Sequence, residues 1–132
     1  MIATFQDLEQ CTNPMNGTSL ASPAEIDTFF QTLSGRKPFM FELRGDNGFM
    51  LTIGLASDCA AVQYSPSEGL PPYLIAVASD EIEAGGFVEF LAGGTPTPIP
   101  RRFCLPAKRV QIIVQDFLLH GEKSNTVEWE EI

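Results

Sequence analysis

Apolar residues occupy every second position in two stretches near the middle of the chain. The first stretch covers 39–43 and the second covers 49–53, and Gly45-Asp-Asn-Gly48 separates them. A period of two places alternate side chains on one face of a strand, and turn residues of this kind connect neighbouring antiparallel strands. The pattern therefore predicts a β-hairpin with one apolar face.

Shorter runs rich in aliphatic and aromatic residues predict further strands. They cover 60–64, 73–78 and 87–91, each bounded by Gly, Pro, Ser or Asp, and a last run covers 126–131. The connections between the earlier runs are too short for helical crossovers, which favours antiparallel pairing. Gly93-Gly94-Thr95 and the alternate prolines behind it predict a rigid, exposed loop instead of a strand.

Two segments carry the three- and four-residue spacing of amphipathic helices. The first begins at Ser22-Pro23, where a capping hydroxyl precedes a proline and an acid, and it continues to Leu33. The second opens at Pro106 and runs to His120, and Gly121 supplies a left-handed end. We therefore predict an α+β fold in which two helices pack on one face of an antiparallel sheet of five or six strands.

The apolar content is high enough for a single domain. The chain has 132 residues, of which 44% are apolar and ten are Phe, so residues 1–132 can bury a core without disulfides or metal. Residues 1–21 contain the turn-forming pairs Asn13-Pro14 and Asn16-Gly17, and they predict an extended or loosely packed arm. The first residues of this arm could still pair with an edge of the sheet.

Acidic residues outnumber basic ones by a wide margin. The chain has 17 Asp and Glu against 8 Lys and Arg, which gives a formal net charge of −9 and a pI of about 4.4. Coulomb repulsion then opposes direct binding to a nucleic-acid backbone or to an anionic membrane. A cationic protein partner suits this charge, although acidity can also serve solubility alone.

The N-terminal residues show no basic segment followed by an apolar run, so they do not predict a secretory signal. No apolar run reaches the roughly 20 residues that span a bilayer. Cys11, Cys59 and Cys104 are odd in number and include no Cys-x-x-Cys pair, which favours reduced, buried thiols. Reduced thiols and the missing signal predict a cytoplasmic protein. Because His120 is the one histidine, we predict no metal site, and we predict no cofactor.

Candidate catalytic groups are few. A Ser or Cys nucleophile needs a His beside it, but His120 lies in the last predicted helical turn, where an imidazolium suits the helix end. Glu81 with Glu83, and Glu128 with Glu130, have the spacing that places two carboxylates on one strand face. A small carboxylate-dependent hydrolase is therefore one alternative, and an acidic structural or adaptor protein is another.

Three aromatic residues are candidates for either packing or recognition. Trp129 lies on the apolar side of the last predicted strand, which favours a place in the core. Tyr64 and Tyr73 flank a loop stiffened by prolines, Ser65–Pro72. Tyrosines beside a rigid loop suit a protein contact surface, and they equally suit ordinary packing at strand ends.

The order and spacing of residues over the last two thirds of the chain resemble immunity protein family 1 of bacterial polymorphic toxin systems. These are small antitoxins often found beside nucleic-acid deaminase toxins. The residues that carry the resemblance are Thr52-Ile-Gly54, Tyr64, Gly85-Gly86, Val88, Phe90, Gly93, Ile99-Pro100, Leu105-Pro106, Phe117, Gly121, Ser124, Val127, Trp129 and Glu130-Glu131. The bulkier second helix, with Ile112-Ile-Val114, and the residues before Ser22 depart from the family pattern.

The resemblance implies an inhibitor without catalysis that binds a cognate toxin, a cytosine deaminase acting on DNA or RNA, and blocks its active site or substrate channel. The acids in loops between predicted strands are the expected contacts for the basic surface of such a toxin. The candidate partner-binding residues are Glu68, Asp80, Glu81 and Glu83, together with Tyr64 and Tyr73.

Overall fold

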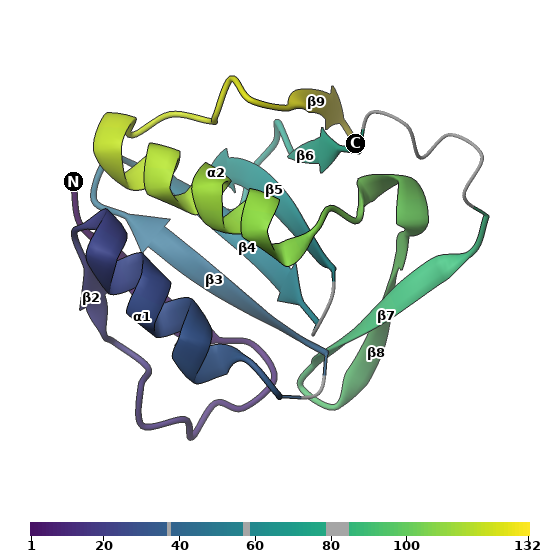
Figure 1. The fold of residues 1–132 in the computed structure, drawn as a ribbon, viewed down its shortest axis with the longest axis horizontal. Helices are drawn as coiled ribbons and strands as arrows, with labels where there is room; N and C mark the ends of the chain where they lie inside the picture. The colour runs from purple at the N-terminus through teal and green to yellow at the C-terminus, as the bar shows by residue number, and fades with distance from the viewer. Residues whose placement is uncertain (37, 57–58, 79–84) are drawn as a thin grey trace.

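The computed structural model of the chain describes residues 1–36, 38–56, 59–78 and 85–132. Its elements in chain order are β1 (Ala3–Asp7), β2 (Ser19–Leu20), α1 (Pro23–Leu33), β3 (Phe39–Gly45), β4 (Phe49–Leu55), β5 (Ala60–Pro66), β6 (Leu74–Val77), β7 (Phe87–Ala92), β8 (Thr95–Pro100), the short helix η1 (Arg101–Phe103), α2 (Ala107–His120) and β9 (Glu128–Glu131). The main sheet has the order β2-β1-β3-β4-β5-β6-β9, and the β7–β8 hairpin joins it beside β3 (Figure 1).

The predicted α+β class is confirmed, and both helices lie on the same face of the main sheet (Figure 1). The predicted strand count of five or six is wrong, because the described residues form nine strands. All pairings between strands are antiparallel except one contact, where Phe39 of β3 pairs in parallel with Leu91 of β7. The strands that the sequence pattern missed are β1, β2 and β8.

The N-terminal segment is part of the sheet and not a loosely packed arm. Strand β1 pairs along its whole length with β3 and also pairs with β2. Within this pairing, the side chains of Ala3 and Phe5 are completely buried. The expectation that the first residues pair with the sheet is therefore confirmed, but β1 lies inside the sheet instead of at its edge.

Strand β8 corrects the expectation of an exposed loop after Gly94. Thr95–Pro100 pairs with β7 in a register that sets Pro96, Pro98 and Pro100 opposite Leu91, Glu89 and Phe87. Because the prolines occupy alternate positions, the backbone N–H groups that they lack would all lie on the same side of the strand. The residues between them can therefore form the hydrogen bonds to β7. An edge strand tolerates this arrangement, because its outer side needs no partner.

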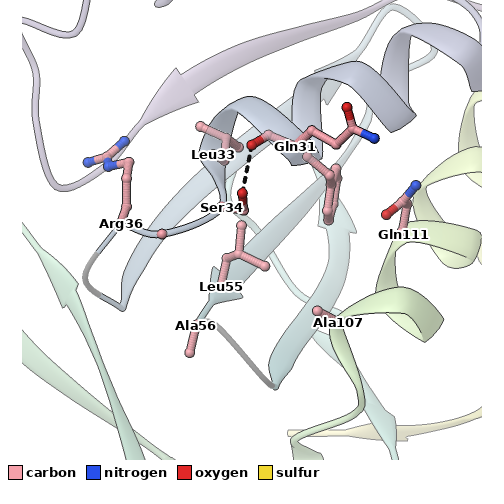
Figure 2. Close-up of a pocket in the computed structure, with 10 residues that line it drawn as sticks. Gln31, Leu33, Ser34, Arg36, Leu55, Ala56, Ala107 and Gln111 are labelled. Carbon is pink, nitrogen blue, oxygen red and sulfur yellow. Dashed lines mark hydrogen bonds between the residues drawn. The ribbon is translucent and has the colours of Figure 1, made fainter.

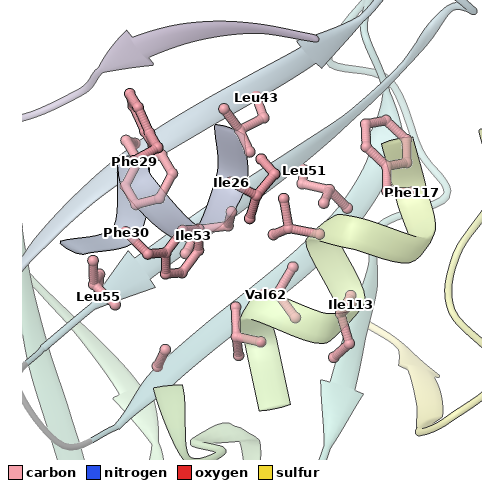
Figure 3. Packing of buried hydrophobic residues seen from close by; sticks show 14 of the residues in the cluster. Ile26, Phe29, Phe30, Leu43, Leu51, Ile53, Leu55, Val62, Ile113 and Phe117 are labelled. Atoms are coloured by element: carbon pink, nitrogen blue, oxygen red, sulfur yellow. The ribbon is translucent and has the colours of Figure 1, made fainter. Parts of the chain in front are cut away.

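The core lies between the helices and the main sheet. Figure 3 shows Ile26 and Phe29 of α1, and Ile113 and Phe117 of α2, gathered over the apolar side of the strands. The ring of Phe29 contacts the ring of Phe5 edge to face, with their centroids 4.8 Å apart. The alternate apolar side chains predicted in 39–43 and 49–53 thus point towards the two helices, as expected for a half-buried sheet.

The opposite face of the sheet is covered in part by the β7–β8 hairpin. Phe90 of β7 is completely buried, and its ring lies over Gly54 of β4. A Cβ atom placed on Gly54 would approach that ring to 2.9 Å, which is closer than van der Waals contact allows. Gly54 is therefore required for space, and it lets the hairpin pack against the centre of the sheet.

Candidate functional site

A cleft of about 620 Å³ opens where α2 ends and β3 turns into β4. We call it the Tyr64 cleft, after the β5 residue in its wall. The residues that line it are Met1, Asn47, Phe49, Tyr64, Leu119, His120, Gly121, Glu122, Lys123 and Asn125. They come from four segments far apart in the sequence, so only the folded chain assembles this surface.

Tyr64 joins the cleft to the core. Its ring stacks on the ring of Phe49 with a centroid distance of 5.1 Å and an interplanar angle of 12°. Edge-to-face contacts with Phe117 at 6.1 Å and with Trp129 at 6.2 Å hold its inner side. Aromatic pairs in these geometries are each stabilising by about 0.5–1.5 kcal/mol beyond their buried area. Tyr64 is therefore a preorganised wall of the cleft.

Exposed apolar side chains gather around this cleft. Leu119 of α2 is 59% exposed and Phe49 is 36% exposed, and both line the cleft. Neighbouring Ile2 is 47% exposed, and its carbonyl accepts a hydrogen bond from the N–H of Asp46 in the β3–β4 turn. A contiguous apolar patch on a small domain commonly marks a binding surface, because burying it against a partner is favourable.

Charged and polar groups form the rim of the cleft. Burial raises the pKa of Tyr64 above its ordinary value, and the carboxylate of Glu122 raises it further. The phenol therefore stays protonated at physiological pH and remains a hydrogen-bond donor. Lys123 and the amides of Asn47 and Asn125 complete a rim that can donate and accept hydrogen bonds.

The loop between β5 and β6 lies beside the cleft and is tied down by hydrogen bonds. The N–H of Ser67 donates to the carbonyl of Gly48 over 2.8 Å, and Arg44 Nη1 donates to the carbonyl of Ser67 over 2.6 Å. The Tyr73 hydroxyl donates to the carbonyl of Gly69 within the same loop. Glu68 is exposed on this loop, so it is available to a partner.

The structure brings some of the predicted contact residues together and leaves others apart. Tyr64 lies in the cleft, and Glu68 lies on the loop that follows the same strand. The hydroxyl of Tyr73 is engaged within its own loop, and among the described residues its ring makes no aromatic contact with Tyr64. Asp80, Glu81 and Glu83 lie outside the described residues.

Sequence reasoning missed Phe49, Leu119 and Glu122 as parts of this surface. Phe49 fits the apolar–polar alternation of β4, and Leu119 lies within the amphipathic helix α2. In the sequence, both therefore resemble ordinary packing residues. The one available signal was that Leu119 falls outside the buried stripe of α2, which consists of Val110, Ile113, Val114, Phe117 and Leu118. An apolar residue on the wrong face of a helix is a reason to suspect a contact surface.

A second cleft, of about 420 Å³, lies between the end of α1 and the start of α2 (Figure 2). Its walls are mainly apolar, and Leu55 and Ala107 face each other across it (Figure 2). Among the described residues its charged lining is Arg36, whose guanidinium is paired with Asp7 at 2.7 Å. The Ser34 hydroxyl donates to the carbonyl of Gln31 over 2.7 Å. The polar groups here are largely satisfied internally, which gives this cleft less recognition chemistry than the Tyr64 cleft.

Trp129 is half-buried at the border of the core, whereas the sequence favoured a place inside it. Its ring packs against the core cluster, and its Nε1–H donates to the carbonyl of Ser124 over 2.8 Å. The neighbouring carboxylates differ in their environments. Glu130 is paired with Arg102, whereas Glu128 is exposed. A pair of carboxylates poised around a substrate needs both groups in one cleft, and neither Glu128 nor Glu130 lines the Tyr64 cleft or the cleft between α1 and α2.

The histidine and the three cysteines differ in how far they are exposed. His120 is exposed at the end of α2, directly before Gly121 in its left-handed conformation. Cys11 is exposed, contrary to the expectation of buried thiols, and Cys59 and Cys104 are half-buried. Within the described ranges, no three His, Cys, Asp or Glu residues are grouped as metal ligands, and no helix is long and apolar enough to cross a membrane.

Comparison with known proteins identifies the family. The profile of the immunity protein Imm1 family matches residues 15–131, which includes the Tyr64 cleft apart from Met1 and takes in α1, α2 and the strands from β2 to β9. No curated protein sequence matches the chain. Because the match covers most of the 132 residues, the resemblance seen in the sequence is confirmed, and the chain belongs to the Imm1 family of immunity proteins.

Proposed function

We propose that the chain is a non-catalytic immunity protein that binds a cognate toxin, a nucleic-acid cytosine deaminase, and blocks its active site or substrate channel. Membership of the Imm1 family is the observation that carries the proposal. Immunity proteins of this family neutralise toxins, so the chemistry belongs to the partner. The formal net charge of −9 then explains how this chain could recognise the basic surface that a nucleic-acid enzyme needs.

Electrostatic attraction supports fast neutralisation. Oppositely charged partners associate at up to about 10⁸–10⁹ M⁻¹s⁻¹ at low salt, against about 10⁵–10⁶ M⁻¹s⁻¹ without steering. An acidic inhibitor can therefore reach a cationic substrate channel quickly. The attraction is screened over about 8 Å at physiological ionic strength, so the association rate should fall as salt rises.

The Tyr64 cleft is our proposed centre of the interface. Binding energy is concentrated in aromatic and other anchor residues that lose contact with water, and a polar rim surrounds them. Phe49, Tyr64 and Leu119 provide apolar contacts, and Glu122 lies beside them on the rim. The exposed carboxylate of Glu68 adds an acidic contact on the neighbouring loop. Asp80, Glu81, Glu83 and Tyr73 complete the proposed contact set.

Co-expression tests the proposed function. The cognate toxin domain, to be identified from the genes neighbouring that of this chain, is expressed in bacteria with this chain, with an unrelated acidic protein of similar size, or alone. We expect growth to be restored only by this chain, and we expect uracil to replace cytosine in nucleic acid only when the chain is omitted. Toxicity that persists in its presence contradicts the immunity role. Protection without any cytosine deamination by the toxin alone contradicts only the assignment of the toxin as a deaminase.

A further inference from the structure

Strand β9 lies at one end of the main sheet, and among the described strands it pairs with β6 alone. In Figure 1 it is the dark yellow arrow beside the C-terminus, and no described strand lies along its outer side. The other end of the sheet is β2, which has only two residues. An open edge presents unpaired N–H and C=O groups, which can accept another strand.

The register of β9 shows which backbone groups point outward. The N–H of Ile132 donates to the carbonyl of Tyr73 over 2.9 Å, and the ladder continues with Ile75 opposite Glu130. In an antiparallel ladder, residues that bond to the partner alternate with residues that point away from it. Glu130 therefore bonds towards β6, and the N–H and C=O groups of Trp129 and Glu131 face the open edge.

The side chains along β9 restrict which strand can bind there. Glu128 and Glu131 are exposed, and neither has an ion pair among the described residues. Arg102 compensates Glu130, so two uncompensated negative charges remain. A second copy of β9 would bring like charges against each other, which is destabilising across a strand pair. A strand carrying Lys or Arg would be attracted instead.

The edge is continuous with the proposed interface. Tyr64, Leu74 and Glu131 are consecutive partners across β5, β6 and β9. Adjacent strands are about 4.8 Å apart, which puts the backbone of Glu131 about 10 Å from that of Tyr64. Trp129 links the two regions, because its ring contacts Tyr64 on the inner side of the sheet. One protein partner of ordinary interface size can cover both.

We infer that the outer edge of β9 binds an extended, basic segment of the toxin by strand addition. The outward N–H and C=O groups of Trp129 and Glu131 form the main-chain bonds, while Glu128 and Glu131 select cationic side chains. This inference rests on the proposed function, and it specifies the partner segment as a β-strand bearing Lys or Arg.

Amide hydrogen exchange on the unmodified chain provides the first test. In the free protein, the amide protons of Trp129 and Glu131 should exchange much faster than that of Glu130, which is bonded to β6. Adding the cognate toxin domain used in the co-expression test should slow exchange at Trp129 and Glu131 by at least tenfold. Unchanged exchange at these two amides in a complex that has formed overturns the inference.

A pair of substitutions at one position provides the second test. Glu131→Ala removes the carboxylate and keeps the outward N–H, whereas Glu131→Pro removes both. Because that N–H points away from β6, the proline variant should fold with nearly unchanged thermal stability. We expect Glu131→Pro to bind the toxin domain at least tenfold more weakly than Glu131→Ala, measured by titration calorimetry.

The outcomes separate this inference from the proposed function. Binding of the two variants within twofold of each other, while the unmodified chain binds and protects, overturns the strand addition and leaves the immunity role intact. Failure of the unmodified chain to bind overturns both. A dimer of the free chain that dissociates on Glu131→Pro substitution would show that β9 pairs with a second copy, and it would also overturn the inference.

Discussion

Replacement of Asp7 by Asn tests how the N-terminal segment is held in the fold. Asp7 is 2% exposed, and its Oδ1 accepts hydrogen bonds from the N–H groups of Glu9 and Gln10, each at 2.8 Å. Its Oδ2 accepts from Asn13 Nδ2 at 2.9 Å and from Arg36 Nη1 at 2.7 Å. An asparagine keeps the first oxygen but sets an NH₂ group against the two donors on the other side.

The expected cost follows from these contacts. Hydrogen bonds to charged groups contribute about 1.5–3 kcal/mol each, and Asp7→Asn loses two. Arg36 is 29% exposed on its side chain, so water compensates part of its loss, and we expect a decrease of about 2–4 kcal/mol in the free energy of unfolding. Stability of about 5–15 kcal/mol is typical of a domain, so the variant should still fold.

The same carboxylate makes the effect dependent on pH. Burial alone would raise the pKa of Asp7, but hydrogen bonds from Asn13, Gln10, Arg36 and Glu9 outweigh it and lower the pKa. The lowered pKa means that Asp7 contributes stability above its unfolded pKa of about 3.9 and loses that contribution as the pH falls through the folded value. The wild type and Asp7→Asn should therefore differ most near pH 7 and converge towards pH 2.

Urea denaturation at a series of pH values measures this difference, with the exposed turn variant Asp46→Asn as the matched control. The control should stay within about 0.5 kcal/mol of the wild type, as surface substitutions usually do. A loss below about 0.5 kcal/mol for Asp7→Asn at pH 7 would refute the reasoning. A difference that does not shrink in acid would show that the charge of Asp7 is not the cause.

Two further substitutions test the packing on either face of the sheet. Gly54→Ala should destabilise the fold by about 1–3 kcal/mol, the usual cost of overpacking, because the new Cβ would lie 2.9 Å from the Phe90 ring; equal denaturation midpoints for Gly54→Ala and wild type would contradict this. Trp129→Ala should cost about 2–3 kcal/mol, below the 3–5 kcal/mol of a fully buried aromatic, since Trp129 is half-buried and donates to Ser124. A loss under about 1 kcal/mol in the same assay would show that Trp129 contributes little to the fold.

The elements with strong local signals were predictable from the sequence. The predicted cap at the start of α1 is present, because the Ser22 Oγ accepts from the N–H of Glu25, and the Glu25 carboxylate accepts from the N–H of Ala21, one residue before the cap. The left-handed Gly121 ends α2 with φ of 71°. These features depend on residues within one turn of each other, so neighbouring sequence is enough to specify them.

The missed elements depend on contacts between distant parts of the chain. Strand β1 forms because β3, more than thirty residues later, offers it an apolar partner surface. Strand β8 forms in spite of its prolines because β7 lies on one side of it and no described strand lies on the other. The open edge of β9 is likewise set by its pairing with β6, about fifty residues earlier. Local propensity carries no information about such pairings.

The sequence predicted the chemical character of the candidate site but not its location on the fold. The excess of acids indicated a cationic partner, and Tyr64 was identified beside a rigid loop. The cleft itself needs the N-terminus, the β3–β4 turn and the end of α2 to meet. The way in which these three segments pack decides whether Phe49 and Leu119 are buried or exposed. No pattern within a single segment specifies that packing.

Titration of the purified toxin domain with the purified chain tests the central claim most directly. The cognate toxin domain used in the co-expression test is assayed for cytosine deamination on single-stranded DNA and on RNA while the chain is added in increasing amounts. We predict that activity falls to background at a fixed stoichiometric ratio, that added salt slows the onset of inhibition, and that no turnover by the chain itself is required. Full toxin activity in the presence of a large excess of folded chain would contradict the account.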